Sequence, residues 1–239
     1  MANKLDIFVL LTGSNGYLGQ KILRQLVHSE IRHTLLLHTE SIEEVNWNPI
    51  THIINCAAVL PANNRTLNQY YSGNVTFIEN LLPHLKGKII IHFSTSSMFY
   101  RYGEYQISKM IGDLIFFHNR HNFKKLEVIT LPTLNDKDLI DNIVLDVENR
   151  KNPIVDDLTY HYCDPNIVAQ LVVDNLGQNA QLLIPFQKKN LYNEVTKRVN
   201  IYVKKGALIQ RNNLINNFWS TSSEAKGYFA KLFTTTTNR

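Results

Sequence analysis

A tyrosine and a lysine stand four residues apart in the segment EYQISK, which spans residues 104–109. Residues at this spacing share one face of a helix. An ammonium group beside a phenol favours the phenolate, so Tyr105 could exchange a proton closer to neutral pH than its ordinary pKa of about 10 allows. The spacing also arises by chance, and an amphipathic helix with Lys109 on its surface is the alternative interpretation.

A glycine-rich segment follows the first apolar run and reads TGSNGYLG from Thr12 to Gly19. Its glycines have the spacing GxxGxxG. Between a strand and a helix, glycines let the backbone approach a pyrophosphate at the helix N-terminus and let the helix pack closely on the sheet. The segment therefore predicts a dinucleotide site, with a tight connection as the alternative. The candidate binding residues are Gly13, Ser14, Asn15, Gly16, Tyr17, Leu18 and Gly19.

Four consecutive hydroxyl residues, Ser94 to Ser97, end the apolar run KIIIHF. Open α/β sheets bind their ligands in the crevice at the carboxyl ends of the strands. A hydroxyl in that place could orient a carbonyl group of a ligand. The same residues could instead cap a following helix.

Apolar, β-branched runs alternate with helical patterns along the chain, which is typical of βαβ units and a parallel sheet. Strands are expected at residues 7–11, 33–38, 52–56, 88–93, 126–131 and 181–184. Helices are expected at residues 18–28, 66–84, 104–119, 136–148 and 166–176. The segment 40–49 has room for only one or two helical turns. The predicted fold class is α/β, a doubly wound parallel-sheet Rossmann fold.

The length of 239 residues fits one α/β domain, or one domain with a modest appendage. The formal net charge of +5 is uneven, because residues 186–239 carry ten Lys or Arg residues against two acids, Glu194 and Glu224. This excess suggests an anionic ligand or surface, although a solvated basic face would look the same. Nucleic-acid binding is disfavoured, because no Arg-rich recognition helix or aromatic RNA-binding signature accompanies the charge.

The two cysteines, Cys56 and Cys163, cannot form a disulfide framework, and neither has Cys or His neighbours at zinc-ligand spacing. A reducing cytoplasm is therefore the expected location, and no metal site is expected. The apolar runs are far shorter than the roughly 20 residues that a membrane helix needs. The N-terminus lacks the small-residue cleavage site of a signal peptide, so we treat it as the first strand.

The order of these motifs resembles the extended short-chain dehydrogenase/reductases of the epimerase/dehydratase type. The glycine turn is followed by NCAA at residues 55–58, by Asn74 in GNVTFIENLL and by FSTSSMF. YQISK, LPT at residues 131–133 and LTYHYCDPNIVAQLV at residues 158–172 then complete the series. Ordered matches over about 170 residues make coincidence improbable. Within this family, STSSMF is most similar to the corresponding strand of the dTDP-4-dehydrorhamnose reductases.

The resemblance implies a role for each motif. It makes Tyr105 a proton donor and Lys109 the residue that lowers the Tyr105 pKa and holds the nicotinamide ribose. The hydroxyl on the substrate carbonyl is implied to be Thr95, with Ser96 as the alternative. The further cofactor-binding residues that it implies are His38, Cys56, Ala57, Ala58, Asn74, Leu131, Pro132 and Thr133. The implied substrate-binding residues are Ser96, Ser97, Asn135 and Asn166.

The function implied is reduction of a keto group on a nucleotide-linked deoxysugar, with the hydride coming from NADPH. Two alternatives stay open, a nucleotide-sugar epimerase that retains NAD and a dinucleotide-binding sensor or scaffold without turnover. Dehydration is disfavoured, because Ser96 and Ser97 replace the Asp-Glu pair of the 4,6-dehydratases. Tyr105 stands only ten positions after Thr95 in the chain, where relatives insert a longer substrate loop.

The end of the second predicted strand, LHTE at residues 37–40, bears on the choice between NAD and NADP. An acid there would bind the ribose hydroxyls of NAD, whereas a basic or hydroxyl group would tolerate the additional phosphate of NADP. Because His38 itself is not an acid, NADP is expected, and NAD remains possible through Glu40.

Residues 1–134 are expected to form the dinucleotide-binding core. Residues 135–239 are expected to complete the sheet and form a small substrate-binding portion, with a disordered tail at residues 234–239. Basic residues of this second part would face the substrate diphosphate, with Lys188, Lys189, Arg198 and Arg211 as candidates. The expected partners are the nucleotide-sugar substrate and a second copy of the chain, bound through the helices that contain Asn74 and Tyr105. Neither nucleic acid nor membrane is an expected partner.

Overall fold

A computed structural model of the chain describes residues 6–62, 65–99, 103–134, 136–150, 154–156, 159–178, 182–199 and 204–206. The chain divides into two compact units. The larger unit comprises residues 1–138 and 160–189, and the smaller unit comprises residues 139–159 and 190–239. Among the described residues, no helix is long and apolar enough to cross a membrane.

The larger unit is built on a parallel sheet of five strands in the order β2-β1-β3-β4-β5. Its strands are β1 (Phe8–Thr12), β2 (Arg32–Leu36), β3 (His52–Asn55), β4 (Ile89–Thr95) and β5 (Lys125–Leu131). The chain leaves β1 toward β2 and then crosses back to β3 on the other side of β1. Ligands bind at such a reversal of strand order in open α/β sheets. The prediction of an α/β fold with a parallel sheet is confirmed.

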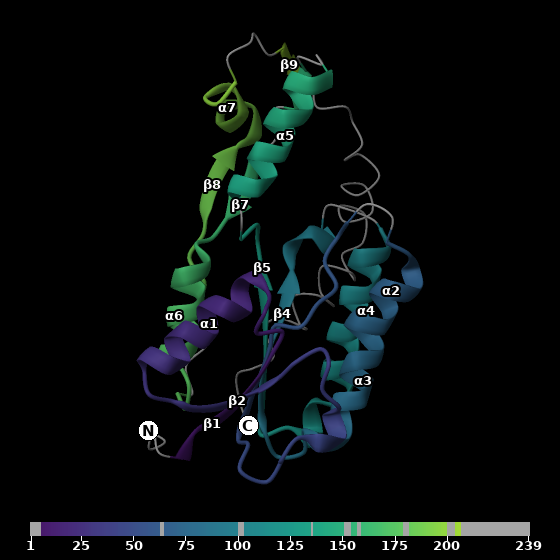
Figure 1. Cartoon of the computed structure of the whole chain (residues 1–239), viewed down its shortest axis with the longest axis vertical. Coiled ribbons are helices and arrows are strands. Elements are labelled where there is room, and N and C mark those ends of the chain that lie inside the picture. Colours follow the sequence, from purple (N-terminus) through teal and green to yellow (C-terminus); the bar gives the residue numbers. More distant parts are fainter. Residues whose placement is uncertain are drawn as a thin grey trace, which may run out of the picture. The chain divides into compact units, whose positions relative to one another are not determined.

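Helices cover both faces of this sheet. Figure 1 shows α1 (Tyr17–His28) and α6 (Pro165–Asp174) on one face, and α2 (Leu67–Tyr71), α3 (Phe77–Leu81) and α4 (Glu104–His118) on the other. Two apolar cores result, and alternate residues of β1 serve them. Val9 and Leu11 pack toward α1, whereas Leu10 packs toward α3. Burial of both faces explains why the strands are continuously apolar.

The predicted helix at residues 66–84 exists but changes its winding along its length. Thr66 caps it in a reciprocal pair with Gln69, and α2 then leads into a five-residue π-helix at Ser72–Thr76. α3 follows, and the helix closes with a 3-10 turn at Leu82–His84. π-helical turns are rare and often lie at functional sites.

Helix α4 packs unusually close to this π-helix. The contact is made by Gly112, where an added Cβ would lie 2.7 Å from the carbonyl oxygen of Asn74. A side chain at position 112 would therefore push α4 away from the π-helix. The glycine therefore permits a close backbone-to-backbone approach between α4 and the π-helix.

The predicted strand at residues 181–184 is wrong. Gln181 lies outside the described residues, and Leu182 to Ile184 has no regular structure. Leu182 and Ile184 do pack against the α1-side core, but the backbone N–H of Leu182 donates to Oε1 of Glu127, at 2.8 Å, and not to a β5 carbonyl. Short apolar runs are buried in this way without strand pairing. The segment 40–49 holds a single 3-10 turn, Ile42–Glu44, as predicted.

The remaining elements are short. A 3-10 turn at Ser96–Phe99 follows β4, and another at Arg120–Asn122 follows α4. β7 (Thr159–Tyr162) pairs with β8 (Gln187–Asn190), and Tyr162 also bridges to Thr133. The smaller unit contains most of α5 (Asp136–Arg150), together with α7 (Leu191–Thr196) and the parallel pair of β6 (Ile154–Asp156) with β9 (Lys204–Gly206).

Two buried histidines make the fold sensitive to acid. Burial lowers the pKa of both His52 and His92 to about 4. In the unfolded chain the same groups bind protons near pH 6.5. The stability linked to their neutral forms is therefore present above pH 6.5 and is lost as the pH falls toward 4. We expect Tm to fall by on the order of 5 °C between pH 7 and pH 5 in scanning calorimetry.

The substitution His52→Gln should reduce the steepness of this fall, because Gln does not titrate. His118 is exposed, so His118→Gln serves as the control and should leave the curve unchanged. Identical curves for the parent and His52→Gln would show that His52 does not carry the effect.

Candidate active site

The glycine turn joins β1 to α1 and lies against the segment that follows β3. Gly13 has a φ of +66°, a conformation that suits glycine, and an added Cβ would lie 2.5 Å from the backbone nitrogen of Ala57. A Cβ at Gly19 would overlap the carbonyl oxygen of Gly13, whereas one at Gly16 would lie 3.1 Å from that oxygen. The tight turn and the close helix packing therefore both require glycine.

The N-terminus of α1 has the groups that an anion needs. Gly16 is the N-cap residue and offers no side chain to the first N–H groups of the helix. Ser14 is buried, and its Oγ has no hydrogen-bond partner among the described residues. Unpaired donors at a helix N-terminus stabilise negative charge. These features fit the pyrophosphate of a dinucleotide.

The ammonium of Lys109 is buried between α4 and β4. The side chain is only 3% exposed, and Nζ donates to the carbonyl oxygen of Phe93 at 2.7 Å. Burial lowers the pKa of Lys109, and this effect is opposed by the negative charge of Asp113 and by Cys56. The alternative of a surface lysine is therefore wrong.

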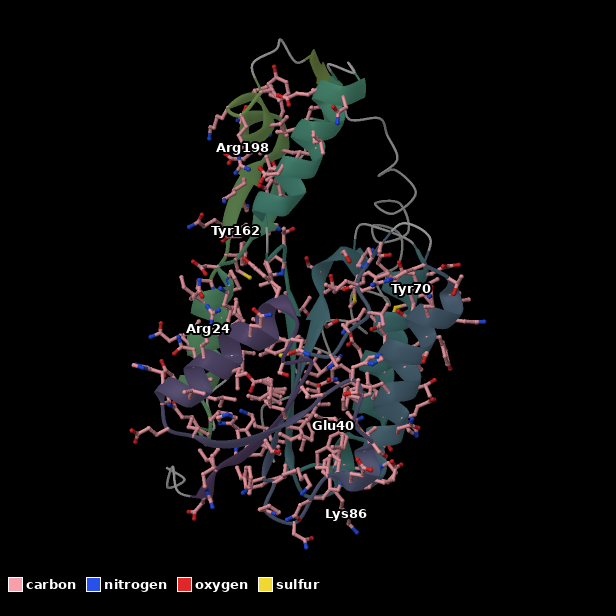
Figure 2. All side chains as sticks on the ribbon, viewed as in Figure 1. Arg24, Glu40, Tyr70, Lys86, Tyr162 and Arg198 are labelled. Atoms are coloured by element: carbon pink, nitrogen blue, oxygen red, sulfur yellow. The ribbon has the colours of Figure 1, made fainter. Side chains whose placement is uncertain are left out.

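Tyr105 lies one helical turn before Lys109 and is half-buried. Its ring meets that of Tyr70 edge to face, with ring centroids 6.0 Å apart. Tyr70 comes from α2 and is labelled in Figure 2. The Tyr70 hydroxyl accepts a hydrogen bond from Ala62 N at 3.3 Å, so the Tyr105 ring is packed against a side chain that also holds the loop before α2.

Hydroxyl groups link the end of β4 to the first turn of α4. Thr95 Oγ1 lies 2.9 Å from Ser97 Oγ, and the backbone N–H of Ser97 donates to Thr95 Oγ1 at 3.2 Å. Gln106 Nε2, adjacent to Tyr105 in the chain, donates to Ser97 Oγ at 3.3 Å. Thr95 and Ser96 are both half-buried. These contacts bring the predicted carbonyl-binding hydroxyl and the predicted proton donor to the same end of the sheet.

The segment Cys56 to Ala58 follows β3 and lies beside the glycine turn. The backbone N–H of Cys56 donates to the carbonyl oxygen of Thr12 at 3.2 Å. Burial raises the pKa of the Cys56 thiol, so the thiol is neutral and unsuited to act as a nucleophile. The segment lies close to the glycine turn, because backbone atoms of Cys56 and Ala57 would lie within 2.7 Å of a Cβ added at Gly13; its role in cofactor binding stays a prediction.

The side chain of Asn74 is fully engaged within the protein. Oδ1 accepts from Val59 N at 2.7 Å, and Nδ2 donates to Val59 O at 3.1 Å and to Ser108 Oγ at 2.9 Å. Asn74 thus ties the segment after β3 to α4.

Leu131, Pro132 and Thr133 lie at the end of β5. Thr133 N donates to His161 O at 3.1 Å, and Thr133 O accepts from Cys163 N at 3.0 Å, so this segment is fixed to β7. Asn166 is exposed in the first turn of α6, where its N and Nδ2 both donate to Oδ1 of the N-cap residue Asp164. Asn135, also predicted to bind substrate, lies outside the described residues.

At the end of β2, His38 and Glu40 are both exposed. The Glu40 carboxylate, labelled in Figure 2, accepts a hydrogen bond from Leu37 N at 2.7 Å. An acid is therefore fixed close to the strand end where dinucleotide ribose hydroxyls bind in this fold.

Basic side chains of the C-terminal part are partly paired within the chain. Lys189 Nζ lies 4.0 Å from the centre of the Tyr162 ring, which is also labelled in Figure 2. Arg198 donates to Asp141 Oδ1 at 2.7 Å. Lys188 is exposed, and Arg211 lies outside the described residues.

Sequence reasoning missed a group of buried polar residues beneath the site. Thr12, Asn55, His92 and Asp113 are hydrogen-bonded in series on the α4 side of the sheet. The one available signal was Asp113, which stands four residues after Lys109 on an amphipathic helix.

No protein-family model and no curated protein matches the chain, but its fold matches solved structures. One is a dTDP-4-dehydrorhamnose reductase from Clostridium acetobutylicum, with a TM-score of 0.63, 14% identity, and coverage of 86% of this chain and 85% of that one. A second is UDP-glucuronic acid 4-epimerase from Bacillus cereus in complex with NAD, with a TM-score of 0.65, 13% identity, and coverage of 90% and 91%. A third is RMD from Pseudomonas aeruginosa complexed with NADPH, with a TM-score of 0.63, 11% identity, and coverage of 84% and 87%. The resemblance to the extended short-chain dehydrogenase/reductases is thereby confirmed for the fold.

The two glycines of the turn should respond differently to substitution by alanine. Gly19→Ala places its methyl group on the Gly13 carbonyl and should lower the free energy of unfolding by about 2–4 kcal/mol. Gly16→Ala meets only a tight contact and should cost less than about 1 kcal/mol. Urea denaturation of both variants measures the difference. Equal losses would show that the turn is not packed as described.

Proposed function

We propose that the chain is an extended short-chain dehydrogenase/reductase that reduces a keto group on a nucleotide-linked deoxysugar, with NADP(H) as its cofactor. The observation that carries the proposal is the buried ammonium of Lys109, one turn from Tyr105 on α4 and bonded to β4 beside Thr95. Burying a charge costs free energy, and strongly perturbed titratable groups cluster at functional sites. A buried ammonium beside Tyr105 would assist proton transfer by the phenol.

In this proposal, Tyr105 donates a proton to the carbonyl oxygen of the substrate while Thr95 hydrogen-bonds the same oxygen. Lys109 stabilises the phenolate that remains. The turn from Gly13 to Gly19, with the unpaired Ser14 hydroxyl, holds the pyrophosphate of the dinucleotide, and Cys56 to Ala58 and Leu131 to Thr133 line its remaining length. The dinucleotide, when bound, supplies the hydride.

The substrate class is inferred from two sources. The family resemblance implies a nucleotide-linked sugar, and the neighbours of known structure include proteins named for dTDP- and UDP-linked sugars. Ser96, Ser97, Asn135 and Asn166 are the proposed substrate contacts, and the segment after residue 134 is proposed to supply the substrate-binding portion. Lys188 is exposed and is a proposed contact for the diphosphate of the substrate.

Reduction is favoured over epimerisation because little protein is available to cover the proposed dinucleotide site. An epimerase retains its dinucleotide through two hydride transfers, whereas a reductase exchanges it in every cycle. Only nine residues lie between Thr95 and Tyr105, and a single 3-10 turn, Ile42–Glu44, replaces a helix after β2. Both features leave less protein to cover the dinucleotide and support a cofactor that exchanges.

A second copy of the chain is the proposed macromolecular partner. The helices that contain Tyr105 and adjoin Asn74 expose several large apolar side chains, each more than 40% accessible. They are Leu67, Tyr71, Ile107 and Leu114. Burial of such side chains between two copies would stabilise a homodimer.

The proposed reaction is tested with a 4-keto-6-deoxy sugar nucleotide and NADPH. The parent should consume NADPH in proportion to product, measured as absorbance of the reduced nicotinamide. Tyr105→Phe should bind dinucleotide as the parent does, in a thermal-shift titration, but turn over about 10²–10⁴-fold more slowly, because the general acid is removed. Tyr71→Phe, an exposed tyrosine on α2, is the matched control and should be fully active.

Three results would contradict the proposal in different ways. Protein that purifies with near-equimolar NAD(H) and interconverts sugar epimers without net change in absorbance would be an epimerase. Dinucleotide binding without turnover on any keto sugar would make the protein a sensor or scaffold. Full activity of Tyr105→Phe would place the proton donor elsewhere.

The preference for NADP(H) over NAD(H) is expected to be small. His38 is exposed and can accommodate the additional phosphate, but Glu40 lies close enough to repel it. Glu40→Gln keeps a group that can accept from Leu37 N and removes the charge. This substitution should tighten NADPH binding relative to NADH by about tenfold, a change of about 1.4 kcal/mol.

Glu43→Gln provides the control for this measurement, because Glu43 is an exposed acid in the next turn and is bonded to Ser41. Dissociation constants for both dinucleotides, measured by fluorescence quenching, show whether Glu40 affects the preference between NADPH and NADH. A ratio of constants that shifts equally in both variants would reflect overall charge and would exclude a specific role for Glu40.

A further inference from the structure

A row of polar side chains crosses the sheet beneath the proposed active site. Thr12, Asn55 and His92 are in register on β1, β3 and β4, next to one another in the sheet. All three are buried, on the face that α4 covers. Asp113 of α4 completes the row, with 7% of its surface exposed.

The hydrogen bonds in this row run in one direction. Ala57 N donates to Thr12 Oγ1 at 3.3 Å, and Thr12 Oγ1 donates to Asn55 Oδ1 at 2.6 Å. Asn55 Nδ2 then donates to Nδ1 of His92 at 3.1 Å, which leaves the ring proton on Nε2 to be donated to Asp113 Oδ1, also at 3.1 Å. This assignment of protons gives each of these groups a partner.

The row ends on the carboxylate of Asp113, which a second donor also reaches. Ser94 Oγ, two residues beyond His92 on β4, donates to Asp113 Oδ2 at 2.5 Å. Charge-assisted hydrogen bonds of this kind are short and fix the orientation of the carboxylate. Both oxygens of Asp113 are thus fixed by donors from β4.

Asp113 stands one helical turn after Lys109. The charge states of the neighbouring titratable groups decide which of them can balance the Lys109 ammonium. Burial lowers the pKa of His92 to about 4, so the ring is neutral near pH 7. The Cys56 thiol, which faces Lys109 from the segment after β3, is neutral because burial raises its pKa. Tyr105 on α4 is the proposed acid. Among these described groups, Asp113 alone supplies a negative charge to balance the buried ammonium.

We propose that Asp113, fixed by His92 and Ser94, is a positioning residue that keeps Lys109 charged while the Lys109 ammonium is bonded to the Phe93 carbonyl. Through His92, Asn55 and Thr12 the same carboxylate is tied to the backbone of Ala57, at the proposed cofactor segment. The inference rests on the proposed function, in which a charged Lys109 holds the nicotinamide ribose and stabilises the phenolate.

The test is the pH dependence of dinucleotide binding, which needs no turnover. Asp113→Asn preserves the shape and the hydrogen-bonding capacity of the side chain but removes the charge. Lys109 should then lose its proton at lower pH. We expect the dissociation constant for NADPH, measured by fluorescence quenching, to stay within twofold of the parent at pH 6 and to rise about tenfold above it at pH 9. The alkaline limb of kcat should move to lower pH in parallel.

Two control variants separate charge from structure. Ser94→Ala removes one of the two hydrogen bonds that fix the carboxylate but keeps its charge, so it should lower stability and shift the pH midpoint of binding less than Asp113→Asn does. Glu104→Gln removes an exposed acid from the first turn of α4 and should change neither quantity. Asp113→Glu keeps the charge and should retain a midpoint close to that of the parent.

The inference is overturned if Asp113→Asn has the parental midpoint, or if Asp113→Glu shifts the midpoint as far as Asp113→Asn does. Asp113→Ser is the second neutral variant, to which the same criterion applies. If both neutral variants fail to fold while Asp113→Glu folds, the carboxylate serves folding and the inference also falls. Absence of dinucleotide binding in the parent would instead overturn the proposed function.

Discussion

A positive charge buried between a sheet and a helix is the constraint on which this structure depends. The Lys109 side chain is 3% exposed, and its ammonium donates a hydrogen bond to the carbonyl oxygen of Phe93. An ion in such a place is stable only with compensating groups close by. Helix α4 must therefore lie close to β4, and the absence of a side chain at Gly112 lets it pack directly against the π-helix.

The neighbouring elements hold this arrangement from two directions. Asn74, in the π-helix, bonds both to Val59 after β3 and to Ser108 on α4, so it ties the proposed cofactor-side segment to the helix that carries Tyr105 and Lys109. Tyr70 packs against Tyr105 from the same helical segment. The change of winding at Ser72–Thr76 thus coincides with the residues that connect the two halves of the site.

Local sequence signals predicted the parts of the fold that local physics determines. The β-branched runs gave five strands, and the glycine turn gave the β1–α1 connection with its positive φ at Gly13. Within the false strand at residues 181–184, Leu182 and Ile184 are apolar for another reason, because they pack partly buried against the α1-side core without strand pairing. The polar row could not be predicted, because it depends on the register of Thr12, Asn55 and His92 on strands distant in sequence, and His92 sits inside an otherwise apolar run.

The exposed edge of β2, and the way its end is closed before the 3-10 turn, bear on how the molecule resists self-association. β2 is an edge strand, and exposed strand edges invite pairing with other chains. Polar residues such as Arg32 and His33 discourage this, and Glu40 closes the strand end by bonding to Leu37 N. Under the proposed function, a mutation of Glu40 made to change the cofactor preference would therefore also alter a hydrogen bond at the end of this edge strand, and the tendency of the protein to self-associate would change with it.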